Sequence, residues 1–435
     1  MSAPLHQSRR AFAGGRRAAP QRARRSLVVR ASGQDGRMDL FSPSKVRICF
    51  CACALEQGAA SRPPPPTPPP HWQPPRSNAR LKRPSNPAAQ QQQINLFLRV
   101  VRRREDGYHD LASLFHVIDL GDRMALRRRS GAATTSDVLR CSDPTVPSDG
   151  RNLVIKALDL YRRKAFPPGT PPQDLPWFDV DLEKAVPHGA GLGGGSGNAA
   201  TALWAANELC GRRATDADLL AWSGEIGSDI SVFFGPTGAA YCTGRGEVVE
   251  PVSPLPLPLD TPLLLVKPPV GLSTPAIFKA LDLGARSPRD PRELLAAVSD
   301  VSALQAAAVN DLEQPAFDCL PELAAMKRRL QGREGDARGV PFDAVFMTGS
   351  GSTVVCVGSD APPAWLAAEG WRGKEEGAKE AEEGEDDVFV SPARLIARDA
   401  ASDGRPMWYS PSASGEAARA ALRAAQQQKV APVRR

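Results

Sequence analysis

A glycine-rich segment constrains the fold of this chain more than any other feature: Pro187-His-Gly-Ala-Gly-Leu-Gly-Gly-Gly-Ser-Gly-Asn198. It follows the strand-like run Phe178–Leu182 and precedes Ala199–Leu209, whose Ala- and Leu-rich sequence favours a helix. Glycines let backbone N–H groups approach an anion, and a helix N-terminus adds partial positive charge. The segment therefore predicts a phosphate site, with a flexible linker as the alternative. It matches neither a Walker A loop nor a GxGxxG dinucleotide motif.

The pattern around this segment is that of a mixed α and β protein. Ile94–Val101 and Leu114–Leu120 are predicted strands, with the turn-forming Arg104–Gly107 between them. Asn152–Lys164 carries apolar residues at helical spacing and is a predicted helix. No uninterrupted run of about 18 apolar residues occurs, which excludes a membrane span. The eight cysteines have neither CxxC nor zinc-like spacing, so they indicate no metal site or disulfide framework.

The formal net charge of +7 is unevenly distributed along the chain. Residues 1–34 carry eight arginines and no acid, and residues 46–93 carry six basic residues and one acid, which leaves −6 for the rest. A nucleic-acid-binding function is therefore not favoured. Residues 1–31 have the Arg-, Ala- and Ser-rich composition of an organelle transit peptide, with a plastid-like processing site before Ser32. A disordered basic arm is the alternative.

Three further segments depart from the ordered pattern. Eleven of the 48 residues at 46–93 are prolines, and the segment ends in four glutamines, so it is predicted to be a disordered insertion. Residues 372–387 carry eight acids against three bases and are predicted to form a surface loop. The polar, Ala- and Gln-rich tail at 411–435 is predicted to be disordered.

The glycine segment is one of four motifs that occur together in one enzyme class. The others are Asp106–His109, Ile226–Asp229 and Thr348–Thr353. With the plant-type stretch Tyr241–Glu247, they resemble the GHMP small-molecule kinases and, among these, the 4-diphosphocytidyl-2-C-methyl-D-erythritol kinases of plants and algae. The resemblance covers about residues 38–410 apart from the proline-rich insertion.

The resemblance implies an α+β fold of two domains with the active site between them. The N-terminal domain would comprise residues 32–45 and 94–255, with the glycine loop at 187–198, and the C-terminal domain would comprise residues 256–410. The implied enzyme is an ATP-dependent phosphotransferase of the chloroplast stroma. It would phosphorylate the 2-hydroxyl of 4-diphosphocytidyl-2-C-methyl-D-erythritol in isoprenoid biosynthesis, giving the 2-phosphate and ADP, with Mg²⁺ bridging the phosphates. Its partners would be these small molecules, without nucleic acid or membrane, and the oligomeric state stays open.

In the resembled family the glycine loop binds the ATP phosphates. The implied nucleotide contacts in this chain are Pro187, Gly189, Gly191, Leu192, Gly193, Gly194, Gly195, Ser196 and Asn198. Gly197 stands where the family's loop has a second serine, which keeps the backbone cradle and removes one hydroxyl. Asp229 is implied as the general base that takes the proton of the 2-hydroxyl. From the residues alone, a helix-capping role is the alternative.

The implied cytidine site is formed by Tyr108, His109 and Phe278. An aromatic face can stack on cytosine while an imidazole and nearby backbone read its polar edge. Phe278 resembles the opposing stacking ring, and Thr274 matches a substrate-lining threonine of the family. Packing within the turn or the core is the alternative for these aromatic residues.

Members of the family carry Lys-Ile-Asn in their first motif, with the lysine against the catalytic aspartate and the asparagine on the substrate. This chain has Gln93-Ile94-Asn95, whereas Lys45 ends the run Phe41-Ser-Pro-Ser-Lys45. Joining Lys45 to Ile94 restores the plant-type motif. One hypothesis is that residues 46–93 are a translated retained intron, since 48 codons preserve the frame and valine and CAG codons supply the boundary dinucleotides. A genuine proline-rich insertion, such as a polyproline II ligand, is the alternative.

Two rival functions remain open. Another kinase of the class, acting on mevalonate or homoserine, is less compatible with Asp106–His109. The chain as written could also bind ligand without turnover, because Lys45 is displaced from its motif.

Overall fold

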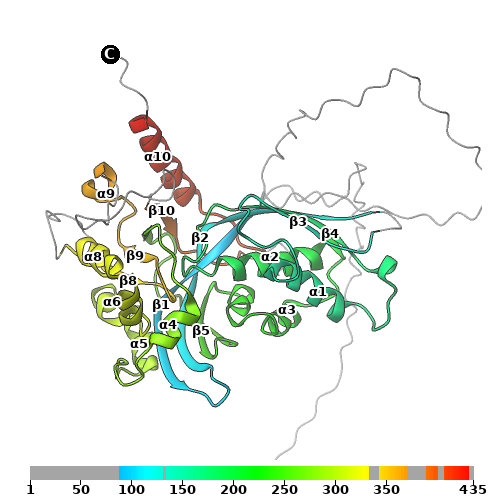
Figure 1. Ribbon diagram of the computed structural model, residues 1–435, viewed down its shortest axis with the longest axis horizontal. Coiled ribbons are helices and arrows are strands. Elements are labelled where there is room, and N and C mark those ends of the chain that lie inside the picture. The colour runs from blue at the N-terminus through cyan, green and yellow to red at the C-terminus, as the bar shows by residue number, and fades with distance from the viewer. Residues whose placement is uncertain (1–87, 131–133, 333–341, 370–387, 400–405, 431–435) are drawn as a thin grey trace, which may run out of the picture.

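The computed structural model describes residues 88–130, 134–332, 342–369, 388–399 and 406–430 (Figure 1). The strands are β1 (Ala88–Arg103), β2 (His109–Arg128), β3 (Val138–Cys141), β4 (Phe178–Glu183), β5 (Ala239–Gly244), β6 (Val248–Pro251), β7 (Pro262–Lys267), β8 (Ala344–Met347), β9 (Val354–Val357) and β10 (Phe389–Arg394). The α-helices are α1 (Leu153–Ala165), α2 (Gly194–Leu209), α3 (Asp216–Ser223), α4 (Thr274–Ala280), α5 (Pro291–Ala297), α6 (Val301–Ala307), α7 (Glu313–Cys319), α8 (Pro321–Leu330), α9 (Ala364–Glu369) and α10 (Ala413–Val430). Two 3₁₀ helices are η1 (Pro172–Asp174) and η2 (Ser228–Phe234).

The first sheet is built around the long hairpin of β1 and β2. One edge of β2 pairs with β1, and the other pairs with β5 and then β4, giving the order β3-β4-β2-β5-β6 with β1 beside β2. The predicted turn is present: the Arg104 N–H donates to the Tyr108 carbonyl at 2.8 Å, and Gly107 has a φ of 84°. Helices α1, α2 and α3 lie beside this sheet, on the right of Figure 1.

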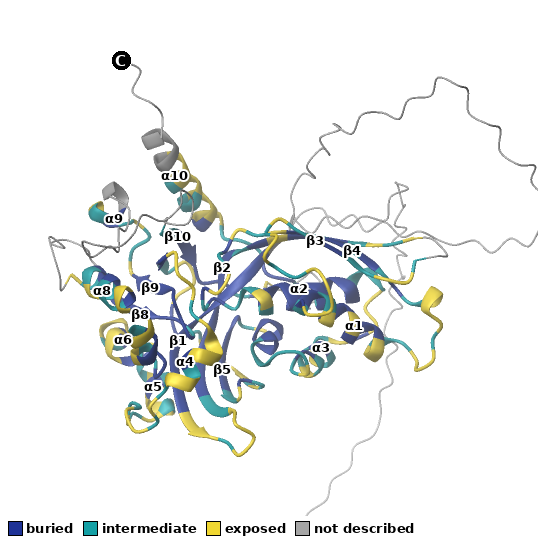
Figure 2. Ribbon diagram, in the orientation of Figure 1, coloured by how far each residue is buried: buried dark blue, intermediate teal, exposed yellow. Residues whose placement is uncertain are grey.

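The second sheet has the order β10-β7-β9-β8. Alternate residues of β7 face opposite sides. Leu263 and Leu265 belong to a core cluster shared with Ile94 and other residues of the first hairpin. Leu264 and Val266 pack instead in a cluster with residues of α7 and α8. The strands of the second sheet are therefore largely buried (Figure 2). The expected α+β architecture is confirmed.

The chain returns to the first sheet after β10. The Ile396 N–H donates to the Val117 carbonyl of β2 at 3.1 Å. Trp408 stacks on Trp204 of α2 with ring centroids 5.2 Å apart, and its indole N–H donates to Thr201 at 3.2 Å. Trp408 also packs against Phe234 at the end of η2. This C-terminal segment therefore contacts both the helix that follows the glycine loop and the element that carries Asp229.

Two predicted disordered segments contain regular structure. Residues 88–93, assigned to the insertion, form the first part of β1, because backbone N–H and C=O groups pair with β2 whatever the side chains are. Residues 413–430 of the tail form α10, whose Ala-rich sequence favours a helix and whose Arg419 pairs with the buried Asp119 at 2.9 Å. The transit-like residues 1–31, Lys45 and the acidic loop 372–387 lie outside the described residues.

Candidate active site

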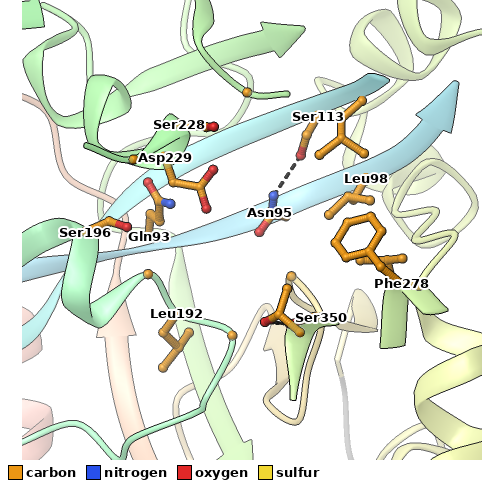
Figure 3. A pocket seen from close by; sticks show the side chains of 18 of the residues that line it. Gln93, Asn95, Leu98, Ser113, Leu192, Ser196, Ser228, Asp229, Phe278 and Ser350 are labelled. Carbon is orange, nitrogen blue, oxygen red and sulfur yellow. Dashed lines mark hydrogen bonds between the residues drawn. The ribbon is translucent and has the colours of Figure 1, made fainter. Parts of the chain in front are cut away.

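A cavity of about 920 Å³ lies where the β1–β2 hairpin, the glycine loop, η2, α4 and the Gly349–Ser350 turn meet (Figure 3). It gathers nearly all the predicted site residues from the described part of the chain. They are Pro187, Gly189, Gly191, Leu192, Gly193, Gly194, Gly195, Ser196, Asp229, Asn95, Tyr108, His109, Thr274 and Phe278.

The glycine loop has the conformation that its sequence requires. Gly189, Gly191 and Gly193 have φ values of 64°, 71° and 67°, in the left-handed region that favours glycine. A Cβ on Gly191 would lie 2.7 Å from the Thr348 carbonyl oxygen, so the backbone approach also excludes a side chain. Helix α2 starts at Gly194, inside the predicted loop. Its first N–H groups and Ser196 therefore stand at the cavity, as a phosphate site needs.

Asp229 lies in the first turn of η2 and does not act as its cap, since Gly227 occupies that position without a side-chain bond. Its carboxyl group points into the cavity (Figure 3). Burial raises its pKa from 3.8 to about 6, and no charged group among the described residues offsets this effect. The arrangement gives a carboxylate that is ionised at neutral pH and basic enough to accept a proton.

Gln93 occupies the position where the family motif has lysine. The Gln93 amide and the Asp229 carboxyl point toward the same part of the cavity (Figure 3). Gln90, Gln91, Gln92 and Gln93 are all buried. Six of their side-chain amide atoms have no hydrogen-bond partner in the described structure, and an unpaired buried polar group is destabilising. These glutamines are therefore poorly suited to the part of β1 that they occupy.

A chain of hydrogen bonds fixes the substrate side of the cavity. The Asn95 amide donates to the Ser113 hydroxyl at 2.7 Å, and the Asn95 backbone N–H donates to the Thr348 hydroxyl at 2.8 Å. On the facing wall, the Thr274 and Ser350 hydroxyls are 2.7 Å apart. Ser113 and Ser350 were not predicted as site residues. Ser113 is an isolated serine in a strand and carries no signal, whereas Ser350 lies within the Thr348–Thr353 motif, to which no individual role was assigned.

The aromatic groups differ in arrangement from the expected sandwich. His109 stacks directly on Phe278, with ring centroids 5.2 Å apart and an interplanar angle of 26°. Tyr108 is 60% exposed, and the Arg245 guanidinium lies 5.3 Å from its ring centroid. A planar base needs roughly 7 Å between two rings, so it cannot lie between His109 and Phe278 unless these move apart.

Asn198 and Lys184 also differ from expectation. Asn198 does not line the cavity; it is buried in α2, and its amide donates to Asp122 at 2.9 Å. Lys184 lines the cavity and was not predicted, although it stands only three positions before the glycine segment.

Comparisons with known proteins identify relatives of this chain. The profile described as "GHMP kinases N terminal domain" matches residues 152–240. The chain is 47% identical over 322 residues to the chloroplastic/chromoplastic 4-diphosphocytidyl-2-C-methyl-D-erythritol kinase of Solanum lycopersicum, covering 74% of this chain and 72% of that protein. It is 42% identical over 275 residues to the kinase of the same name from Protochlamydia amoebophila, covering 63% and 85%. A crystal structure of 4-(cytidine 5'-diphospho)-2C-methyl-D-erythritol kinase is 31% identical, with a TM-score of 0.47, covering 62% of this chain and 89% of that one.

The fold, the glycine loop and the carboxyl group beside it define an ATP-dependent small-molecule kinase of the GHMP class. Within this class, the chain belongs to the 4-diphosphocytidyl-2-C-methyl-D-erythritol kinase family. The plant relatives from Solanum lycopersicum, Arabidopsis thaliana, Oryza sativa and Mentha piperita are all named chloroplastic, which confirms the predicted location. No helix within the described ranges is long and apolar enough to cross a membrane.

Proposed function

We propose that this chain transfers the γ-phosphoryl group of ATP to the 2-hydroxyl of 4-diphosphocytidyl-2-C-methyl-D-erythritol. The observation that carries the proposal is the convergence in one cavity of the glycine loop, Asp229 and the His109–Phe278 ring pair. The loop would hold phosphates, Asp229 would accept the hydroxyl proton, and the aromatic groups would bind the cytosine. Asn95 and Thr274 would contact the acceptor portion of the substrate.

We infer the steps of this transfer from the chemistry of the residues at the cavity. The loop N–H groups and the start of α2 would stabilise charge on the phosphates, and positioning supplies most of the catalysis in phosphoryl transfer. Asp229 would hydrogen-bond the 2-hydroxyl and take its proton as the phosphoryl group arrives. Because burial raises the pKa of Asp229 to about 6, the carboxylate combines ionisation at neutral pH with useful basicity.

The site also fits Mg²⁺ carried by ATP. Within the part of the chain that the structure describes, no group of three His, Cys, Asp or Glu side chains could hold a metal ion. Mg²⁺ in kinases is commonly bound through substrate phosphates and few protein ligands. The hydroxyl oxygen of Ser196, which lines the cavity, would be a ligand of this Mg²⁺ ion. The ion would neutralise charge on the phosphates.

We further propose that the active form lacks residues 46–93, so that Lys45 directly precedes Ile94. In that form Lys45 would replace Gln93 in β1 and stand beside Asp229. Six of the eight side-chain amide atoms of Gln90–Gln93 lack a hydrogen-bond partner in the described structure, and this supports the proposal because it indicates that these glutamines are poorly suited to this strand. Sequencing the transcript across codons 40–100 tests it, and a message found only with codons 46–93 would contradict it.

The activity test compares two proteins that start at Ser32, with and without residues 46–93. Formation of ADP is measured with the cytidyl alcohol, mevalonate and homoserine as acceptors. Of the three acceptors, we expect only the cytidyl alcohol to give ADP. The protein without residues 46–93 should turn it over much faster than the protein that contains them. Binding of the cytidyl alcohol by both proteins without ADP formation would instead indicate an inactive relative.

A further inference from the structure

One buried carboxylate, that of Asp122 on β2, connects the two ends of the glycine loop. Its Oδ1 accepts hydrogen bonds from the backbone N–H groups of Ala185 at 2.9 Å and Val186 at 3.1 Å, directly before the loop. Its Oδ2 accepts one from the Asn198 amide at 2.9 Å, on the first turns of α2, and forms an ion pair with the Lys184 ammonium. The Asp122 side chain has no exposed surface.

We propose that Asp122 is a positioning residue for the nucleotide, and this inference rests on the kinase function proposed above. The residues between Val186 and Asn198 include six glycines, which have unusually large conformational freedom. Tying the chain at both ends of this stretch to the same carboxylate fixes how far apart the ends are. The loop is thereby held in the shape that presents its N–H groups to the phosphates.

The contacts require a carboxylate at this position. Four donors converge on Asp122: two backbone N–H groups, one carboxamide and one ammonium. An ionised carboxylate accepts on both oxygens, whereas the amide group of asparagine accepts on one and donates on the other. Asparagine at position 122 would therefore present its own N–H₂ group to the donors of Lys184 and Asn198.

This link also explains why Asn198 is absent from the cavity wall. Its Nδ2 is used by Asp122, and its Oδ1 is buried without a partner among the described residues. Asn198 therefore acts on the loop through Asp122 and makes no direct contact with the cavity.

The chain offers a matched control on the same strand. Asp119 is also fully buried on β2, and it accepts hydrogen bonds from the Arg394 backbone N–H at 2.8 Å and from the Ser412 hydroxyl at 3.0 Å, and pairs with Arg419. None of these partners lines the cavity. Asp119→Asn therefore removes an equally buried charge from the same strand without touching the loop.

The test measures the affinities of ADP and of CDP for the full chain by titration calorimetry, so that it does not depend on turnover. We expect Asp122→Asn to weaken ADP binding at least tenfold and to leave the affinity for CDP within twofold of the parent. Asp119→Asn should leave both affinities within twofold. Asn198→Ala removes only the hydrogen bond from α2 to Asp122 and should weaken ADP binding about threefold. It provides a second variant if Asp122→Asn does not fold.

The decisive variant exchanges the two groups. In Asp122→Asn combined with Asn198→Asp, the new amide can still accept from Ala185 and Val186 and can donate to the new carboxylate, so ADP affinity should return to within threefold of the parent. Equal loss of ADP and CDP affinity in Asp122→Asn, or no recovery in the exchanged pair, would overturn the inference. Failure of the unsubstituted protein to bind ADP both with and without residues 46–93 would overturn the kinase function itself, and this inference with it.

Discussion

Replacing Gln93 with lysine in the full chain tests whether the first motif lacks its cation. Gln93 lines the cavity and points toward the same region as Asp229 (Figure 3). An opposite charge within about 4–6 Å lowers the pKa of a carboxyl group by roughly 1–3 units. A lysine at position 93 should therefore lower the pKa of Asp229, which burial raises to about 6. The ammonium should also stabilise charge on the transferring phosphoryl group and raise kcat by about 10²-fold.

The same substitution has a signature in stability. The pKa of Asp229 is raised on folding, so the folded protein holds this proton more tightly than the unfolded chain. Stability from this group is therefore full below about pH 4 and is lost as the pH rises to about 6, by up to about 3 kcal/mol. A lysine at position 93 should reduce this loss, because it stabilises the ionised carboxylate.

The assay records kcat/KM for the cytidyl alcohol from pH 4.5 to 8.5, together with urea unfolding at pH 4.5 and pH 7. The acid limb of the profile should move to lower pH in Gln93→Lys. Gln93→Met removes the unpaired amide without adding charge, and it should gain stability while keeping the parent's acid limb. A kcat within twofold of the parent, with an unmoved acid limb, would refute the reasoning.

Three further substitutions separate the roles of other residues. Asp229→Asn should lower kcat by about 10²–10⁴-fold while ADP and CDP still bind within threefold of the parent, as measured by turnover and calorimetry. Phe278→Ala should raise KM for the cytidyl alcohol by roughly tenfold, since a base-stacking contact contributes about 1–3 kcal/mol, and should leave KM for ATP unchanged. Trp408→Ala removes the stack on Trp204 and should destabilise the protein by about 3–5 kcal/mol. Calorimetry would record this as a lower Tm, and an unchanged Tm would show that the C-terminal segment does not stabilise α2.

The sequence predicted those features whose signal is local. The strand before the glycine loop, the helix after it and the turn at Arg104–Gly107 all form where periodicity and turn residues indicated. Some boundaries differ from the prediction by a few residues. Helix α2 starts at Gly194 and not at Ala199, because glycines can adopt a helical backbone even where their N–H groups face a cavity. Local propensity is sufficient at these positions, since the same residues determine both the element and its ends.

The features that the sequence did not predict depend on distant contacts. Asp122 lies 76 positions before Asn198 along the chain, and nothing in its own surroundings indicates that it accepts four hydrogen bonds. The stacking of His109 on Phe278 likewise depends on how α4 packs against the hairpin. The tail at 411–435 was predicted to be disordered from its composition, yet residues 413–430 form α10, whose Arg419 pairs with the buried Asp119 of β2.

Strand β1 shows why an unsuitable segment can leave the fold intact and still alter the chemistry. The backbone of Ala88–Gln91 pairs with Gly121–Met124, and this ladder depends on N–H and C=O groups that every residue but proline supplies. The effect is on the side chains. Buried glutamine amide atoms lack hydrogen-bond partners, and the Asp229 carboxyl group has no neighbouring cation among the described residues. Removal of residues 46–93 would bring Pro43, which has no backbone N–H, to the position of Gln91. The pairing of Ile94–Arg103 with β2 should persist, and both stability and kcat should increase. A gain in kcat without a gain in stability would mean that the buried glutamines are better accommodated than their unpaired amides indicate.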